Sequence, residues 1–196
     1  MDLLKLQTYL FSQQMPLLDS DTMVYCFAHH VSMLAPMMTE LKEQGCCVVH
    51  ILNNETEMSG VAPYETIEGM YTSAGFTVVP IPFSAPLIQT KNESAAVVQY
   101  AQSQHIKRIV YCAPLFHIFR AGLTLMSTAI EQRADFGLTA IILPLNRLNT
   151  LCVTHQGRTQ EPFATVLQME YERIEKYIMT GDILPAPTLW RRLLGK

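Results

Sequence analysis

Residues 108–121 have the sequence RIVYCAPLFHIFRA, and this stretch decides the fold. Its first half, 108–114, is an apolar run of the kind that forms a buried parallel strand. The second half begins an amphipathic segment, 116–131, whose spacing predicts a helix. His117 and Arg120 are three residues apart, so they share one face of that helix, directly after the carboxyl end of the strand. Ligands bind at this edge of open α/β sheets, and an imidazole beside a guanidinium suits an anion.

Strand and helix patterns alternate along the rest of the chain. Buried strands are predicted at 22–28, 46–52, 76–81, 108–114 and 138–143, and helices at 3–14, 32–44, 63–74, 92–104, 116–131 and 162–179. The strands are apolar without a period of two, which indicates burial on both faces. We therefore expect an α/β fold with a Rossmann-like, doubly wound, mostly parallel sheet of about five strands and helices on both faces.

The organisation of the chain follows from what separates these elements. No linker rich in Gly or Ser is present, so we expect one α/β domain over residues 1–196, with its core at about 22–180, an N-terminal helix and a C-terminal tail. Residues 147–160 fit either a hairpin or a long loop. The glycine fingerprints of dinucleotide sites and of P-loops are both missing from the sequence, so neither a standard NAD site nor a Walker-type NTPase is indicated.

The amino-acid composition argues against several classes of protein function, beginning with those of disordered and nucleic-acid-binding chains. Hydrophobic residues make up 49% and charged residues 16%, which favours a compact globule over a disordered chain. The net charge of -3 gives no basic footprint for nucleic acid. The five cysteines show no metal-ligand spacing, and they predict buried, reduced thiols and no metal. Without a signal peptide or an apolar run of membrane-spanning length, the sequence predicts a soluble, cytoplasmic protein. Whether it forms a homo-oligomer stays open.

Polar residues also follow the first two predicted strands. His29 and His30 come after the first strand and fit either a surface pair at a helix start or contacts to a ligand. Ser59 and Gly60 follow the second strand, where Gly60 would allow the backbone to approach a ligand closely. Glu65 lies near the first turn of a predicted helix, where an acid favours the helix dipole.

Glu93 begins the helix that follows the third predicted strand. Asn92 is a candidate N-cap there, and Glu93 then serves only as an acid of the first turn. The alternative is that Glu93 faces His117 and acts as a general base or binds a hydroxyl group. Spacing along the chain does not separate these two interpretations.

Taken in order, these features resemble the YdcF/SanA/ElyC-like domain-of-unknown-function family. The match is carried by Ser59-Gly60 after the second strand, Glu65 in the next helix, Glu93-Ser94-Ala95, and His117-Ile118-Phe119-Arg120-Ala121. The family typically has a Ser-Gly, an acid opening the next helix, a Thr-x-Glu-Asn-Ala motif and a His-x-x-Arg-Ala motif. The resemblance covers roughly residues 22–180. It implies a Rossmann-like domain with a cleft at the carboxyl edge of the sheet.

The resemblance also suggests roles for single residues. If the chain is a ligand-binding member of the family, Glu93, His117 and Arg120 would be its catalytic groups. The ligand would then be contacted by Ser59, Gly60, Glu65 and Ser94, with His29 and His30 lining the opposite wall. The ligand would be a small anionic, phosphate- or nucleotide-like molecule, and S-adenosylmethionine or a nucleotide is the cofactor that the family suggests. No settled reaction accompanies the family, so whether the chain is an enzyme is left open.

The sequence departs from the family pattern at three places. Ala28-His29-His30 replaces a Gly-Gly turn, the segment 32–42 lacks the family's arginine, and Lys91 and Ser94 replace a Thr and an Asn. These departures indicate a diverged member and keep two hypotheses open. Either the chain binds a small anionic molecule at the carboxyl edge, or it is a non-catalytic interaction protein that retains the fold and has lost the family site.

Overall fold

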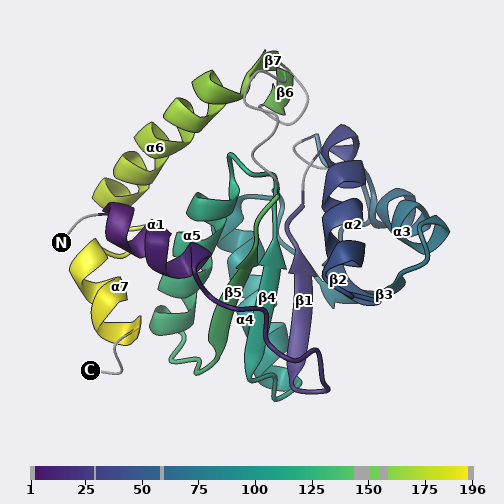
Figure 1. Ribbon diagram of the computed structural model, residues 1–196, viewed down its shortest axis with the longest axis horizontal. Helices are drawn as coiled ribbons and strands as arrows, with labels where there is room; N and C mark the ends of the chain where they lie inside the picture. Colours follow the sequence, from purple (N-terminus) through teal and green to yellow (C-terminus); the bar gives the residue numbers. More distant parts are fainter. Residues whose placement is uncertain (1–2, 29, 58–59, 144–150, 155–158, 194–196) are drawn as a thin grey trace.

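A computed structural model describes residues 3–28, 30–57, 60–143, 151–154 and 159–193. Its main sheet has the strand order β3-β2-β1-β4-β5, and every neighbouring pair is parallel. The strands are β1 (Thr22–Cys26), β2 (Val48–Asn53), β3 (Thr77–Pro82), β4 (Arg108–Cys112) and β5 (Gly137–Ile141). The predicted doubly wound α/β fold is therefore confirmed (Figure 1).

Helices connect the strands in the predicted order. They are α1 (Leu3–Phe11), a 3-10 turn η1 (Val31–Met33), α2 (Leu34–Glu43), α3 (Tyr64–Ser73), α4 (Thr90–Ser103) and α5 (Ile118–Glu131). The chain winds from β1 outward to β3, and then returns to β4 on the other side of β1. Because parallel crossovers are right-handed, this reversal places α2 and α4 on opposite faces of the sheet, as Figure 1 shows.

The reversal also positions the functional site. β1 and β4 are neighbours at the centre of the sheet, paired in register from Thr22 with Arg108 to Cys26 with Cys112. The segments that follow these two strands leave in opposite directions, toward α2 and toward α5. A crevice therefore forms at the carboxyl ends of β1 and β4, which is where ligands bind in open α/β sheets.

The C-terminal part differs most from the sequence prediction. β6 (Leu151–Thr154) and β7 (Thr159–Pro162) form an antiparallel pair, which favours the hairpin over the long loop. α6 (Phe163–Thr180) follows and packs outside α5 rather than on the sheet (Figure 1). The predicted tail contains a further helix, α7 (Ala186–Leu193), whose Leu189 is buried. Prolines at its start concealed it, although a proline is tolerated in the first helical turn.

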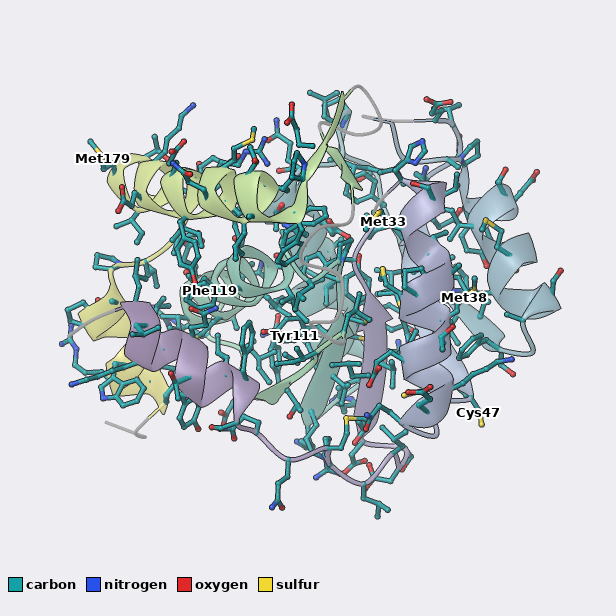
Figure 2. All side chains as sticks on the ribbon, turned by 45° about the horizontal axis from the view of Figure 1, so that its top comes forward. Met33, Met38, Cys47, Tyr111, Phe119 and Met179 are labelled. Carbon is teal, nitrogen blue, oxygen red and sulfur yellow. The ribbon has the colours of Figure 1, made fainter. Side chains whose placement is uncertain are left out.

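One close contact in the core joins β4 to α5. Tyr111 is fully buried in the middle of the protein (Figure 2), and its hydroxyl has no hydrogen-bond partner among the described residues. A Cβ atom on Gly122 of α5 would lie 2.1 Å from the Tyr111 hydroxyl oxygen and 2.8 Å from the ring carbon that carries it. Position 122 therefore has to be a glycine, because the Cβ of any other residue would clash with Tyr111 beneath α5.

We predict that Gly122→Ala lowers the free energy of unfolding by up to about 2 kcal/mol. Overpacking a core costs about 1–3 kcal/mol, and the roughly 1 kcal/mol that a helical alanine gains over glycine offsets part of this cost. Gly69→Ala is the matched control, because Gly69 also lies in a helix but has nothing within 4 Å of the added methyl group. Urea unfolding should show stabilisation for Gly69→Ala and destabilisation for Gly122→Ala. Stabilisation of both variants would contradict the steric account.

Candidate functional site

A cavity of about 540 Å³ lies at the carboxyl edge of the sheet, in the crevice beside β1 and β4. The cavity is lined by residues that follow each of the first four strands and by residues on one face of α6. The lining residues are Ala28, His30, Val61, Ile88, Gln89, Thr90, Lys91, Asn92, Glu93, Phe116, His117, Arg120, Thr124, Val166, Glu170, Arg173, Tyr177 and Asp182. A volume of this size falls within the roughly 300–1,000 Å³ range of small-molecule pockets.

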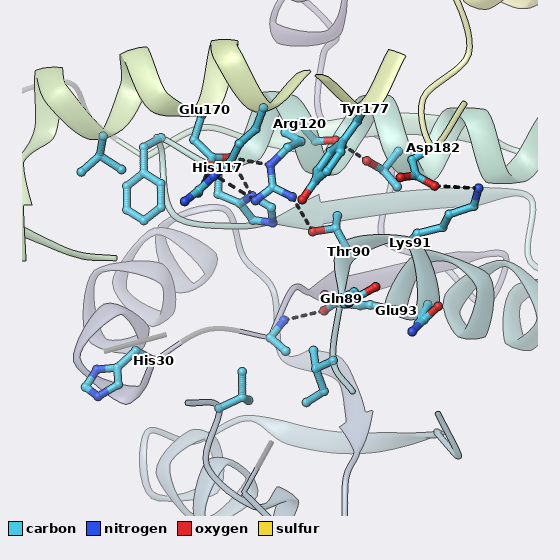
Figure 3. A pocket seen from close by; sticks show the side chains of 18 residues that line it. His30, Gln89, Thr90, Lys91, Glu93, His117, Arg120, Glu170, Tyr177 and Asp182 are labelled. Carbon is cyan, nitrogen blue, oxygen red and sulfur yellow. Dashed lines mark hydrogen bonds and ion pairs between the residues drawn. The ribbon is translucent and has the colours of Figure 1, made fainter. Parts of the chain in front are cut away.

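Arg120 occupies one end of the cavity. Its Nε donates to Glu170 Oε2 at 2.6 Å, and its Nη2 donates to Glu170 Oε1 at 3.3 Å, so the two side chains meet as a fork (Figure 3). Nη1 donates to Thr90 Oγ1 at 2.8 Å, and the guanidinium lies 5.5 Å from the centre of the Tyr177 ring. Three of its N–H groups are thus engaged by described side chains.

His117 stands beside this ion pair at the start of α5. Its Nδ1 lies 3.3 Å from Glu170 Oε2, and since a carboxylate accepts hydrogen bonds, this nitrogen carries the proton. The ring meets the Phe27 ring edge-to-face at 6.0 Å between centres. Burial and the charge of Arg120 lower the pKa of His117, so the imidazole is neutral at neutral pH. His117 therefore contributes a hydrogen-bonding group rather than a second full charge.

Glu170 is the residue that joins these groups. Its side chain is only 2% exposed, and it also pairs with Arg173 one turn further along α6. Burial works to raise the pKa of Glu170, but the hydrogen bond from His117 and the charge of Arg120 outweigh burial and hold the pKa well below its usual range. Glu170 is therefore ionised at any ordinary pH.

Glu93 lies on the other wall of the cavity, and its environment shifts the carboxyl pKa in the opposite direction to that of Glu170. Its Oε1 accepts hydrogen bonds from the Tyr25 hydroxyl and from the Ala28 backbone N–H, both at 2.6 Å. Burial nevertheless raises its pKa to about 7, against the smaller lowering by these bonds and by Arg120. Glu93 thus ties α4 to the end of β1 and can exchange a proton near neutral pH.

The cavity therefore brings together four of the sequence-predicted residues. Glu93, His117 and Arg120 line it, and so does His30, whose Nδ1 also accepts from the Ser32 backbone N–H at the start of η1. His30 therefore fits both interpretations of the sequence, since it lies at the start of a helical turn and also lines the cavity. Glu93 faces the same cavity as His117, although its direct partners are Tyr25 and Ala28.

Three other predicted residues that the structure describes, Gly60, Glu65 and Ser94, do not line the cavity. Glu65 is exposed in the first turn of α3, and Gly60 has a φ of +76°, a left-handed conformation that favours glycine. Ser94 is fully buried. The predictions for His29 and Ser59 fall outside the described residues.

Sequence reasoning missed the contribution of α6. The buried face of this helix consists of Phe163, Val166, Glu170 and Ile174, so an acid stands in an otherwise apolar stripe. An acid at a core position of an amphipathic helix was a signal that could have identified Glu170. Lys91 was also missed as a pocket residue, and its Nζ lies 3.1 Å from Asp182 Oδ1 (Figure 3).

Comparison with known proteins gives no relative for this chain, since no family model and no curated protein matches it in sequence. Among the described residues, no group of three or more His, Cys, Asp or Glu side chains is arranged to hold a metal ion. Nor does any helix in the described ranges have the length and apolar character needed to cross a membrane.

We predict that the Glu93 carboxyl makes stability depend on pH. Because its pKa rises from 4.5 to about 7 on folding, its contribution is fully present below pH 4.5 and is lost as pH rises to about 7. The loss is on the order of 3 kcal/mol, at 1.36 kcal/mol per pKa unit. Glu93→Gln mimics the protonated acid, so the variant should not lose this stability as pH rises.

The measurement compares the variant with the original chain by urea unfolding at several pH values between 4.5 and 8. The comparison is needed because His117, whose pKa is lowered, has the opposite effect in the same range. Glu93→Gln should gain stability relative to the original chain as pH rises. A difference that does not vary with pH would contradict the elevated pKa.

Proposed function

We propose that this chain binds a small molecule with an anionic group, such as a phosphate or a nucleotide-like group, in the cavity at the carboxyl edge of the sheet. The observation that carries this proposal is the convergence of Arg120, His117 and Glu93 on one cavity at the reversal of strand order. Three separate segments of the chain supply these side chains or their partners, which fits a ligand site better than a chance surface cluster.

Charge supports an anion as the ligand. Lys91, Arg120 and Arg173 line the cavity, together with two carboxylates, Glu170 and Asp182, and the partly protonated Glu93. The helix α4 begins at Thr90, which lines the cavity, and α5 begins at Ile118, directly after the lining residue His117. The amino end of a helix carries a partial positive charge, so both ends add to the attraction for an anion.

The two walls differ in what they offer a bound molecule. At the Arg120 end, permanent positive charge and the N–H groups of a guanidinium suit the oxygens of a phosphate or carboxylate. On the other wall, we assign Glu93 the role of exchanging a proton with the ligand, because its pKa lies near neutral pH. If the chain is an enzyme, Glu93 is its acid–base group and Arg120 holds the anionic group.

A second candidate is the interaction protein that has kept the fold without the site. It is favoured by one observation, that Arg120 already forms ion pairs and hydrogen bonds with Glu170 and Thr90. Because the charge of Arg120 is already paired with the Glu170 carboxylate, the site attracts an external anion less strongly. Binding measurements therefore separate the two candidates.

The test is a thermal-shift screen with inorganic phosphate, sugar phosphates, nucleotides and S-adenosylmethionine, followed by calorimetric titration of each compound that raises the melting temperature. We expect at least one anion to bind. Arg120→Lys should weaken its binding at least tenfold, about 1.4 kcal/mol, because a lysine keeps the charge beside Glu170 but loses the fork of N–H donors.

Arg108→Lys is the matched control. Arg108 also pairs with a carboxylate, Asp19, through two Nη2 contacts of 2.7 and 2.6 Å, but it lies at the amino end of β4, on the opposite edge of the sheet. Its substitution should leave anion binding unchanged. A screen in which no anion binds would favour the interaction protein, and equal binding by Arg120→Lys would exclude Arg120 from the site.

A further inference from the structure

The carboxylate of Glu170 occupies the place that an anionic ligand would take. It accepts from Nε and Nη2 of Arg120, from Nη1 of Arg173 and from Nδ1 of His117. These are the donors that an external carboxylate or phosphate would use at this end of the cavity. Figure 3 shows the carboxylate entering from α6 and meeting Arg120 and His117.

The position of Glu170 on α6 connects this contact to the helix. Along the buried face of α6, Phe163 and Val166 precede Glu170 and Ile174 follows it, so the acid is the charged member of an apolar stripe. Phe163 and Val166 pack in a small cluster with Phe116, separate from the main core of the sheet. Ile174 instead packs with Phe119 and Leu189 in a larger apolar cluster, which Tyr171 and Tyr177 of α6 also join. The carboxyl-terminal half of α6 is therefore anchored by apolar contacts, while its amino-terminal half is held by the small cluster and by the ion pairs of Glu170.

The carboxyl end of α6 is fixed to the rest of the protein. The helix ends at Gly181, which has a φ of +80°, and the backbone N–H groups of Asp182 and Ile183 both donate to the Tyr177 carbonyl. Ile183 is fully buried, so a movement of α6 has to pivot about this end. Lys91 and Asp182 meet directly beyond this point, at the edge of the same cavity.

We propose that Glu170 is a resident substitute for the anionic group of the ligand, and that an incoming carboxylate or phosphate displaces it from Arg120 and moves the amino-terminal half of α6 away from the cavity. This inference rests on the proposed anion-binding function and describes how that site is controlled. In the absence of the ligand, Glu170 is the counter-ion of Arg120 and holds this half of α6 closed over the cavity. The ligand and Glu170 compete for the same donors, so the closed helix lowers the apparent affinity.

The competition predicts the effect of Glu170→Gln, which keeps the shape of the side chain and removes its charge. Titration calorimetry with inorganic phosphate and, separately, with acetate should show binding at least tenfold tighter than in the original chain. Without an anion, the variant should have a lower melting temperature, because Arg120 lacks its counter-ion, and saturating phosphate should restore much of the loss. Comparing the two anions shows whether the site prefers a phosphate or a carboxylate.

Glu175→Gln is the control on the same helix, since Glu175 is exposed, and it should leave both anion affinity and melting temperature unchanged. Glu170→Ala is the second variant, in case the amide of glutamine disturbs folding. It leaves a space next to Arg120 that acetate can fill, so acetate should raise its melting temperature more than that of the original chain.

Hydrogen exchange tests the movement of α6 independently. In the original chain, saturating phosphate should accelerate amide exchange across residues 163–170 while the amides of residues 174–180 and of β4 stay protected. Slower exchange in α6 with phosphate would show binding beneath a closed helix and would overturn the displacement. If the original chain binds an anion and Glu170→Gln binds it equally well or more weakly, the competition is overturned, but the proposed anion-binding function stands. No anion binding by the original chain or by either Glu170 variant would overturn this inference and the proposed function together.

Discussion

The ion pair between Arg120 and Glu170 links the parallel sheet to the C-terminal helix. Arg120 belongs to α5, which packs against the sheet, and Glu170 belongs to α6, which packs outside α5. Their contact forms one end of the cavity, fixes Thr90 at the start of α4, and orients His117. The shape and the charge of the site therefore both depend on this pair, and a change in one partner alters the other elements of the cavity.

The energetics of the pair favour a functional role over a stabilising one. Removing two charges from water costs several kcal/mol for each ion, so a buried ion pair contributes little net stability, and well-packed apolar residues often serve as well. The rest of the buried face of α6 is apolar, and another apolar side chain at position 170 would complete the stripe. A charged residue there makes α6 responsive to ions, since an anion can compete for Arg120 and an apolar contact offers no such competition.

The sequence predicted the sheet well because strand burial and helix spacing are local patterns. The stretch 108–121 indicated both the buried strand β4 and the face of α5 that carries His117 and Arg120, and the strand-edge rule placed them at the carboxyl edge. Boundaries differed by a few residues, as at β1, predicted to 28 and ending at Cys26. There the chain leaves the sheet early, where Ala28 donates its N–H to Glu93 instead.

The contribution of Glu170 could not be predicted in the same way. Arg120 and Glu170 are 50 residues apart, and their contact depends on how α6 returns across the edge of the sheet after the hairpin of β6 and β7. No periodicity of the sequence encodes that return. The sequence showed only that an acid lies within the apolar stripe of α6, which indicates a buried partner of positive charge but not which residue supplies it.

Two buried carboxyl groups in one cavity have their pKa values pushed in opposite directions, and this difference assigns their roles. Glu170 receives hydrogen bonds from Arg120, Arg173 and His117 and stays ionised, so it can serve only as a fixed negative charge. Glu93 receives bonds from two neutral donors, and burial raises its pKa to about 7. Pairs of acids separated in this way are typical of sites that both bind a charge and transfer a proton. An anion that displaces Glu170 brings its own negative charge to Arg120, so the charge facing Glu93 is retained. Burial, the largest cause of the raised pKa of Glu93, then continues to hold this carboxyl group ready to exchange a proton with the bound molecule.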